Sequence, residues 1–307
     1  MMPPAFYNPD RVGTLYAPDV QTAIEAGLQA GLSPAAGDSR RVILLLVDTQ
    51  VDFIHPDGAL SVPGAVDDTR RTIAWLYRNA GEVTAIAASL DSHTPMQIFY
   101  PTWWVNDAGA HPAPYTPITV EDVARGVWKP AIEPRWSVEY VEKLEAQARK
   151  VLMIWPYHTM IGTPGQAIVP PLYEAIAFHA AARRAQPMFL SKGAIPRTEH
   201  YSILEPEVKV DDHPQGGLNT AFLDMLAAYD LIYIAGQAKS HCVLETTTSI
   251  MNYFEGQPDV IGRLRFLTDC TSSVQHPDID FDAMANAALA QYQAQGMRMV
   301  TAQDPIG

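Results

Sequence analysis

Short, nearly continuous apolar runs recur along the chain and alternate with segments of helical periodicity. The apolar runs cover residues 41–48, 83–91, 150–155, 187–192, 231–236 and 263–269. Continuous rather than alternating apolarity is typical of strands that are buried on both faces of a parallel sheet. Helical spacing predicts helices over residues 65–80, 138–149, 165–184, 217–229, 242–254 and 279–295. The alternation predicts an α/β fold, a doubly wound, Rossmann-like sheet of about six mainly parallel strands with helices on both faces.

Two regions interrupt this alternation. Residues 1–40 precede the first strand and carry one helical stretch near 18–31. We expect them to form an N-terminal arm that packs on the domain 41–307 or on a neighbouring subunit. The segment at about 94–137 is rich in proline and aromatic residues. A connection of this length is either functional or disordered, and its tryptophans indicate an ordered insertion that covers something.

Composition narrows the class of protein. The chain has 307 residues and a formal charge of −13, and such an acidic protein repels the phosphates of a nucleic acid. No apolar run reaches the roughly 18 residues of a membrane span, and the first residues do not resemble a secretory signal. With only two cysteines, Cys242 and Cys270, a disulfide scaffold is excluded. We therefore expect a reduced, cytoplasmic protein with no membrane or nucleic-acid partner.

Ligands of doubly wound sheets bind beyond the carboxyl ends of the strands, and the chain places reactive side chains there. Cys242 stands at the start of the predicted helix 242–254, where backbone N–H groups and a nearby lysine would lower the pKa of its thiol. A lone cysteine is otherwise usually a small buried apolar side chain, and Lys239 competes with Lys192 as the nearby lysine. The chain lacks GxGxxG and GxxxxGK[ST] motifs, so no nucleotide cofactor is expected. The candidate side chains at the strand ends are Asp48, Asp91, His93, His158, Lys192 and Cys242.

Five segments carry a resemblance to a known family. In chain order they are LLLVDTQVDF, SLDSH, WPYHTMIGTPG, SKG followed by EHYSIL, and AGQAKSHCV. Together they resemble the isochorismatase-like cysteine hydrolases, in particular the nicotinamidases, from about residue 41 to 300. The resemblance implies an isochorismatase-like hydrolase domain whose nucleophile is Cys242. It implies further that Asp48 is the general base and acid, and that Lys192 is the cation that stabilises the thiolate.

The reaction that this resemblance implies is hydrolysis of the C–N bond of a small amide through a thioester. A thiol attacks an amide as the thiolate, so one group must accept its proton and another must stabilise the charge. The proton must later return to the leaving amine. For the oxyanion, the resemblance implies the backbone N–H groups of Ala238 and Cys242, with a cis peptide bond between Gln237 and Ala238.

A second set of residues suggests a metal. Asp91 and His93 are two residues apart, which places both side chains on one side of an extended segment. With His158 they resemble the metal ligands of the family, and three ligands with open positions suit Zn²⁺, or else Mn²⁺ or Fe²⁺. The alternative is a polar loop anchor with His158 capping a turn. Many nicotinamidases carry a further histidine after the second-strand motif, and the stretch TPMQIFYP departs from that pattern.

Phe53, Trp155 and Tyr201 match aromatic positions that line the substrate pocket of the family. Flat aromatic walls suit a planar amide, and plain packing at the rim is the alternative. The insertion starts on the same rim, and its aromatic residues, Trp103 and Trp104 among them, would form either a lid or a subunit interface. An added wall changes which substrates fit, so we expect a preferred amide other than nicotinamide.

Four functions are compatible with these residues. The first is a nicotinamidase-like amidase for a small carboxamide, and the second is a hydrolase of ureido or carbamoyl compounds. The third is an isochorismatase that cleaves a vinyl ether without the cysteine, and the fourth is a non-catalytic binding protein with this fold. The complete set Asp48, Lys192 and Cys242 favours thiol chemistry. Because family members commonly assemble, we also expect a homo-oligomer.

Overall fold

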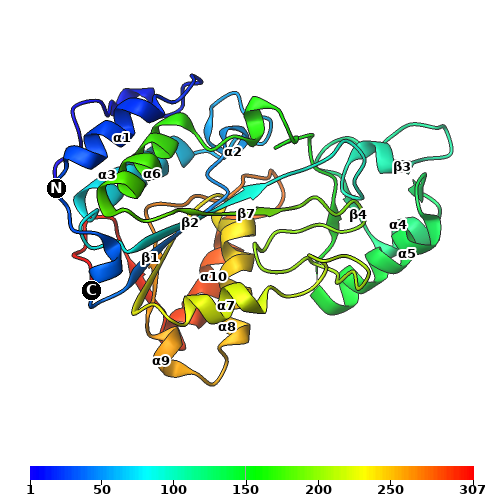
Figure 1. Ribbon diagram of the computed structural model, residues 1–307. Helices are drawn as coiled ribbons and strands as arrows, with labels where there is room; N and C mark the ends of the chain where they lie inside the picture. Colours follow the sequence, from blue (N-terminus) through cyan, green and yellow to red (C-terminus); the bar gives the residue numbers. More distant parts are fainter. Residues whose placement is uncertain (149) are drawn as a thin grey trace.

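The computed structural model describes residues 1–148 and 150–307, and its centre is a six-stranded sheet in which all neighbouring strands are parallel. The strand order is β10–β9–β8–β1–β2–β7, so the first strand of the chain lies in the interior of the sheet (Figure 1). Within the described ranges, no helix is both long and apolar enough to cross a membrane. The strand bounds are β1 Val42–Val47, β2 Ala85–Asp91, β7 Met188–Lys192, β8 Leu231–Gly236, β9 Leu264–Leu267 and β10 Arg298–Val300.

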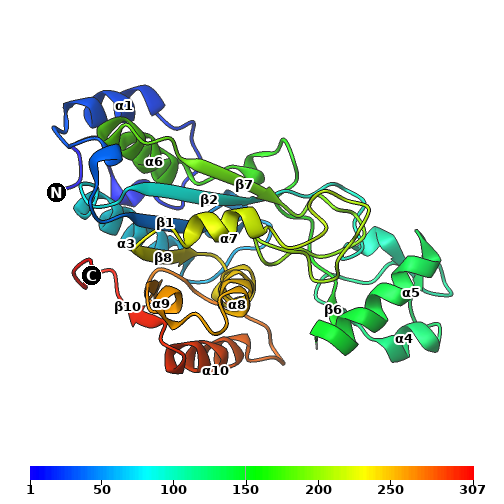
Figure 2. The same ribbon diagram turned by 60° about the horizontal axis from the view of Figure 1, so that its bottom comes forward.

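Helices cover both faces of this sheet. Along β1, Val42, Leu44 and Leu46 belong to one apolar core, while the residues that alternate with them belong to the core on the opposite face. The first core includes residues of α3 and α6. The second includes residues of the four helices that come after β7 in the chain, α7 to α10 (Figures 1 and 2). Burial on both faces explains the continuous apolar runs, and the predicted fold class is confirmed. These helices are α3 Ala65–Arg78, α6 Pro170–Arg183, α7 Thr220–Leu226, α8 Leu244–Tyr253, α9 Pro258–Ile261 and α10 Phe281–Ala294.

The N-terminal arm lies against α6 of the same chain. Its helix, α1 (Val20–Gln29), packs along α6 on the outside of the first core (Figure 1). Glu174 of α6 is 4% exposed and joins the two elements. Its carboxylate accepts hydrogen bonds from the Tyr16 hydroxyl at 3.0 Å and from the backbone N–H of Asp19 at 2.8 Å. The arm therefore extends the helical layer of its own domain.

Between β2 and α6 the chain leaves the sheet and forms a lobe, described for residues 94–148 and 150–153, that lies beyond the carboxyl end of β2 (Figure 2). Two short antiparallel pairs, β3 with β5 and β4 with β6, stand beside two helices. A single turn, α2 (Val51–Ile54), follows β1. The lobe elements are β3 Trp104–Val105, β4 Pro117–Ile118, α4 Val120–Ala124, β5 Lys129–Pro130, α5 Pro134–Lys143 and β6 Leu152–Met153.

One expected strand is wrong. The run 150–155 is not a strand of the central sheet, because β6 pairs antiparallel with β4 inside the lobe. Its apolar character comes from burial in the lobe, where Leu152 and Ile154 are 2% and 0% exposed. The sixth strand is β10, a partly exposed edge strand of three residues whose pattern is too short to predict. The excursion from the sheet is therefore longer than the predicted insertion 94–137.

Trp103 and Trp104 do not form a lid. Both are buried, at 1% and 0% exposure, and they belong to the core of the lobe. The indole N–H of Trp103 donates to the Ser137 hydroxyl at 2.8 Å, and that of Trp104 donates to the carbonyl of Ile98 at 2.6 Å. Their role in this structure is to hold the lobe together.

Candidate active site

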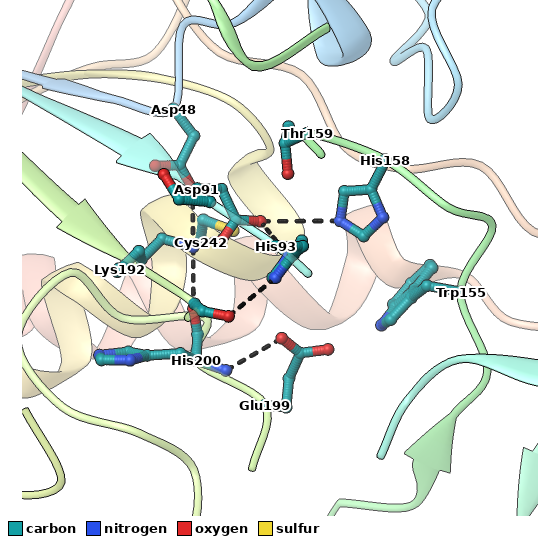
Figure 3. Close-up of polar contacts among 12 residues, drawn as sticks. Asp48, Asp91, His93, Trp155, His158, Thr159, Lys192, Glu199, His200 and Cys242 are labelled. Carbon is teal, nitrogen blue, oxygen red and sulfur yellow. Dashed lines mark hydrogen bonds and ion pairs between the residues drawn. The ribbon is translucent and has the colours of Figure 1, made fainter. Parts of the chain in front are cut away.

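The predicted catalytic side chains meet at the carboxyl end of the sheet. Asp48 follows β1, and Asp91 and Lys192 are paired neighbours at the ends of β2 and β7. Cys242 comes from a π-helical turn, Lys239–Val243, that joins β8 to α8, so it precedes the α-helix rather than opening it. Figure 3 shows these four side chains converging on one region.

Lys192 is the centre of this cluster. Its ammonium lies 2.9 Å from Asp48 Oδ2, 2.9 Å from Asp91 Oδ1 and 3.6 Å from Cys242 Sγ. It also donates to the carbonyl of His200 at 2.8 Å, and the residue is 1% exposed. A buried cation of this kind is tolerated because two carboxylates compensate its charge. The arrangement ties the thiol and both carboxylates to a single positive group.

The rival lysine lies elsewhere. Lys239 Nζ is 2.7 Å from a carboxylate oxygen of Asp282 and donates to Asn286 Oδ1 at 3.1 Å. Both contacts are made on α10. Lys192, the buried last residue of the edge strand β7, is therefore the lysine that faces the thiol.

Burial dominates the protonation of the cluster. Burial and the carboxylate of Asp91 raise the pKa of Asp48, although Lys192 opposes them. Burial also raises the pKa of the Cys242 thiol well above its ordinary value, and Lys192 offsets only part of that shift. The thiol is therefore not acidified in this state as the sequence predicted, because burial, together with two nearby carboxylates, outweighs the effect of one lysine on its pKa. The thiol holds its proton beside a carboxylate of increased basicity.

Asp91, His93 and His158 come together as predicted, with ligand atoms that all lie within 4.8 Å of one another. Both histidines direct Nε2 toward Asp91 Oδ2, at 2.8 Å for His93 and 3.6 Å for His158. Their Nδ1 atoms lie 3.0 Å and 2.8 Å from the carbonyls of Gly193 and Pro156. A carbonyl requires the proton on Nδ1, and in the neutral ring this leaves a lone pair on Nε2 facing a carboxylate. A cation between them resolves that conflict, so the donor set fits a divalent metal.

The geometry at position 193 explains why a glycine follows Lys192. It has a φ of +85°, and a Cβ at this position would lie 2.5 Å from Asp91 Oδ1 and 2.7 Å from His93 Cε1. Both the left-handed backbone and the close approach exclude a side chain. The segment SKG thus brings Lys192 against the carboxylate that it neutralises.

A narrow aromatic pocket opens onto this cluster. The Trp155 indole N–H donates to the Tyr201 hydroxyl at 3.0 Å, and both rings lie with centroids 5.3 Å from that of His241. Phe53 packs edge to face on His158 at 5.6 Å. The three predicted aromatic residues therefore line one cavity with the candidate nucleophile. The lining residues are Phe53, Leu60, Asp91, Trp155, His158, Glu199, Tyr201, Ala238, His241, Cys242 and Val274.

The predicted oxyanion-hole residues also lie at this pocket. The peptide bond between Gln237 and Ala238 is cis, as the resemblance implied. Ala238 is 4% exposed and lines the cavity together with Cys242.

Sequence reasoning missed one polar residue of the pocket, Glu199. It is 5% exposed, and burial raises the pKa of its carboxyl to about 7. One oxygen accepts the backbone N–H of His200 at 2.9 Å, and the residue lies beside His93 and Trp155 in Figure 3. The available signal was its position two residues before Tyr201 in the segment EHYSIL. His241 also lines the pocket, and burial lowers its pKa to about 3.

Solved structures share this arrangement of elements. Yeast nicotinamidase bound to the inhibitor nicotinaldehyde aligns over 85% of this chain and 99% of its own, with a TM-score of 0.58 and 18% identity. A nicotinamidase/pyrazinamidase from Acinetobacter baumanii aligns over 87% and 99%, with a TM-score of 0.54 and 19% identity. The chain has the fold of the nicotinamidases. The search of protein-family models and the search of curated proteins each gave no match.

Proposed function

We propose that this protein is a cysteine-dependent amidohydrolase that cleaves the C–N bond of a small carboxamide through a thioester. One observation carries the proposal: a single buried ammonium, that of Lys192, contacts Asp48, Asp91 and Cys242, and the last two of these line an aromatic pocket. Buried charges are costly, and a purely structural site gains nothing from placing a thiol among them. The nicotinamidase fold supports the same reaction class.

The first half of the reaction forms the thioester. Cys242 Sγ attacks the amide carbon while its proton passes to the carboxylate of Asp48, and Lys192 stabilises the negative charge that develops on sulfur. The carbonyl electron pair moves onto oxygen, where the backbone N–H groups of Ala238 and Cys242 would stabilise it. Asp48 then protonates the amide nitrogen as the C–N bond breaks, and ammonia leaves.

The second half returns the enzyme to its starting state. Asp48, again a carboxylate, removes a proton from water as the water oxygen attacks the thioester carbon. The C–S bond breaks, the carboxylic acid leaves, and the sulfur regains the proton. The raised pKa of Asp48 suits both steps, because the group must accept and return a proton at neutral pH.

A divalent metal would be held by Asp91, His93 and His158, where it would supply a Lewis acid beside the substrate. The protein contributes the rest of the pocket. Trp155, Tyr201 and Phe53 form flat walls, which select a small planar amide and exclude bulk water from the thioester.

The decisive experiment compares the two cysteines. Wild type, Cys242→Ala and Cys270→Ala are assayed for ammonia release over a panel of carboxamides, ureido compounds and carbamoyl compounds. Cys270 is a matched control because it is also buried, at 1% exposure, and burial raises its pKa to about 12. We expect Cys242→Ala alone to abolish hydrolysis while both variants retain the fold.

The panel also decides the substrate class. An active Cys242→Ala variant would overturn the thiol mechanism, and release confined to ureido or carbamoyl compounds would overturn the carboxamide assignment. The sequence predicted a carboxamide other than nicotinamide because the insertion would add a wall to the pocket. The residues that line the pocket include none from 94–137, so that reason falls away. A kcat/KM for nicotinamide of about 10⁴ M⁻¹s⁻¹ or more, the low end for ordinary enzymes, would make nicotinamide itself a substrate.

A further inference from the structure

The side chain of Gln50 is fully engaged beneath the candidate metal site. Its Oε1 accepts the backbone N–H of Asp91 at 2.7 Å, and its Nε2 donates to the carbonyl of Asp91 at 2.7 Å. The second Nε2 hydrogen goes to the carbonyl of Gln166, also at 2.7 Å. Gln50 is 0% exposed. One amide group thus holds both backbone polar groups of Asp91.

Asp52, two residues further on, holds the other arm of the site. Its Oδ2 accepts the backbone N–H of Thr159 at 2.7 Å, and its Oδ1 accepts that of Ala59 at 3.2 Å. Thr159 directly follows His158 and has a φ of +46°. A Cβ on Gly165 would lie 2.1 Å from Asp52 Oδ2, so glycine is required where this carboxylate lies.

The two arms are joined through His93. Its backbone N–H donates to the carbonyl of Thr159 at 3.1 Å, and its carbonyl accepts the N–H of Ile161 at 2.9 Å. Asp91 and His93 are therefore fixed from one side by Gln50 and from the other by the turn that Asp52 holds. Metal affinity depends on such supporting contacts because they set the direction of each ligand.

We propose that Gln50 and Asp52 are positioning residues that hold Asp91 and His158 in the geometry needed to bind a divalent metal. This inference rests on the metal centre of the proposed function. It assigns a task to two of the polar residues of the segment DTQVDF that take no part in the thiol chemistry. In this proposal the three residues have different roles. Asp48 accepts and returns the proton, while Gln50 and Asp52 position the metal ligands.

Isosteric variants test this assignment. Gln50→Glu keeps the shape of the side chain but turns an oxygen toward the carbonyls of Asp91 and Gln166. Asp52→Asn keeps its shape but presents an NH₂ group to one of the two N–H donors. The first variant adds a negative charge and the second removes one, so a simple charge effect predicts opposite changes in metal affinity. Loss of positioning predicts weaker binding in both.

The measurement is the dissociation constant of Zn²⁺ by competition with a chromophoric chelator, together with the visible spectrum of the Co²⁺ form. We expect both variants to bind about 10–100-fold more weakly than wild type, the usual effect of removing a supporting contact, with an altered Co²⁺ band. Gln293→Glu, on the exposed face of α10, controls for the added charge. Asp304→Asn, a carboxylate that accepts the Thr301 N–H at 2.6 Å, controls for the loss of a similar brace elsewhere.

Near-ultraviolet circular dichroism reports whether each variant is folded, and Asp52→Asn carries the test if Gln50→Glu does not fold. Wild-type affinity in a folded variant overturns its positioning role. Opposite shifts in the two variants overturn the geometric explanation in favour of charge. A wild type that binds no metal overturns the inference and the metal centre together. Intact metal binding without amide hydrolysis counts against the proposed function alone.

Discussion

Two lysines of this molecule are each held between two carboxylates, and they differ in what else they contact. Lys192 lies at the strand ends between Asp48 and Asp91, with both ion pairs at 2.9 Å. Lys150 lies beside β6 of the lobe, 2.6 Å from Glu207 and 2.8 Å from Glu245. The side chain of Lys192 is 1% exposed, and that of Lys150 is 27% exposed. By geometry of the ion pairs alone the two clusters would look equivalent.

The two lysines differ in the group that each contacts besides its carboxylates. Lys192 has at 3.6 Å the thiol of Cys242, which lines the aromatic pocket, so its ammonium stabilises negative charge that develops on the sulfur. Lys150 has the ring of Tyr201 instead, with its ammonium 5.5 Å from the ring centroid. A cation over an aromatic face stabilises the position of that ring. The comparison teaches that a buried ion pair becomes a candidate for catalysis through the reactive group beside it.

The largest expected difference concerns the carboxylates. Asp48→Asn removes the proton acceptor without changing shape, so we expect kcat/KM to fall by about 10²–10⁴-fold, the usual contribution of a general base. Glu207→Gln makes the matched change beside Lys150, and it should leave kcat/KM close to wild type. Steady-state ammonia release measures both. Equal losses in the two variants would show that the clusters are not functionally distinct.

A second test replaces each of the two lysines with methionine. Lys192→Met leaves Asp48 and Asp91 as uncompensated buried charges, which costs about 3–5 kcal/mol of unfolding free energy, and it removes the cation that stabilises sulfur. Among variants that still fold, we expect kcat/KM to drop by about 10²–10³-fold, as for the loss of one electrostatic stabiliser. Lys150→Met should destabilise less, because water reaches that lysine. Urea unfolding and the amidase assay together give both quantities, and a larger loss of activity in Lys150→Met contradicts the comparison.

The Lys192 cluster was predictable from sequence because three of its members stand at the carboxyl ends of strands of the sheet. Asp48, Asp91 and Lys192 follow continuous apolar runs, and the carboxyl ends of adjacent parallel strands meet at one edge. Their residue types then indicated the chemistry. The same logic failed for the run 150–155, since an apolar run records burial and not the sheet that provides it.

The Lys150 cluster carries no such pattern. Lys150 precedes a two-residue strand, Glu207 lies in a loop and Glu245 lies on α8. Only the tertiary fold brings these three residues together. Glu199 was missed for the same reason, because it lies in a loop after β7 rather than at a strand end. Long-range pairings between loops depend on tertiary geometry that local periodicity does not encode.

A third prediction uses the pH dependence of stability. Burial raises the pKa of Glu207 to about 7, although Lys150 opposes it, and the ordinary value is 4.5. A raised folded-state pKa gives a stabilising contribution that is complete below pH 4.5 and is lost as the pH rises through 7. Glu207→Gln should therefore flatten the fall in stability over this window, by up to about 1.4 kcal/mol per pH unit. Glu199, with a pKa of about 7, keeps part of the slope in place. Urea denaturation at pH 4.5, 6 and 7.5 gives the slopes, and an unchanged slope in Glu207→Gln rules out this titration.

The smallest expected effect lies at Tyr201, which lines the aromatic pocket and also contacts Lys150. Tyr201→Phe keeps the ring above Lys150 but removes the hydroxyl that accepts the Trp155 indole N–H at 3.0 Å. A lost neutral hydrogen bond is worth about 0.5–1.5 kcal/mol, so we expect KM to rise by about 2–10-fold with kcat nearly unchanged. Tyr201→Leu removes the ring as well, and it should lower stability further because Lys150 loses its aromatic contact.

If Tyr201→Phe instead lowers kcat as strongly as Asp48→Asn, the Tyr201 hydroxyl takes part in the reaction, and Tyr201 belongs functionally with the Lys192 cluster. If Tyr201→Leu is as stable as Tyr201→Phe, the contact with Lys150 does not hold the pocket wall in place, and the lobe cluster is only an ion pair.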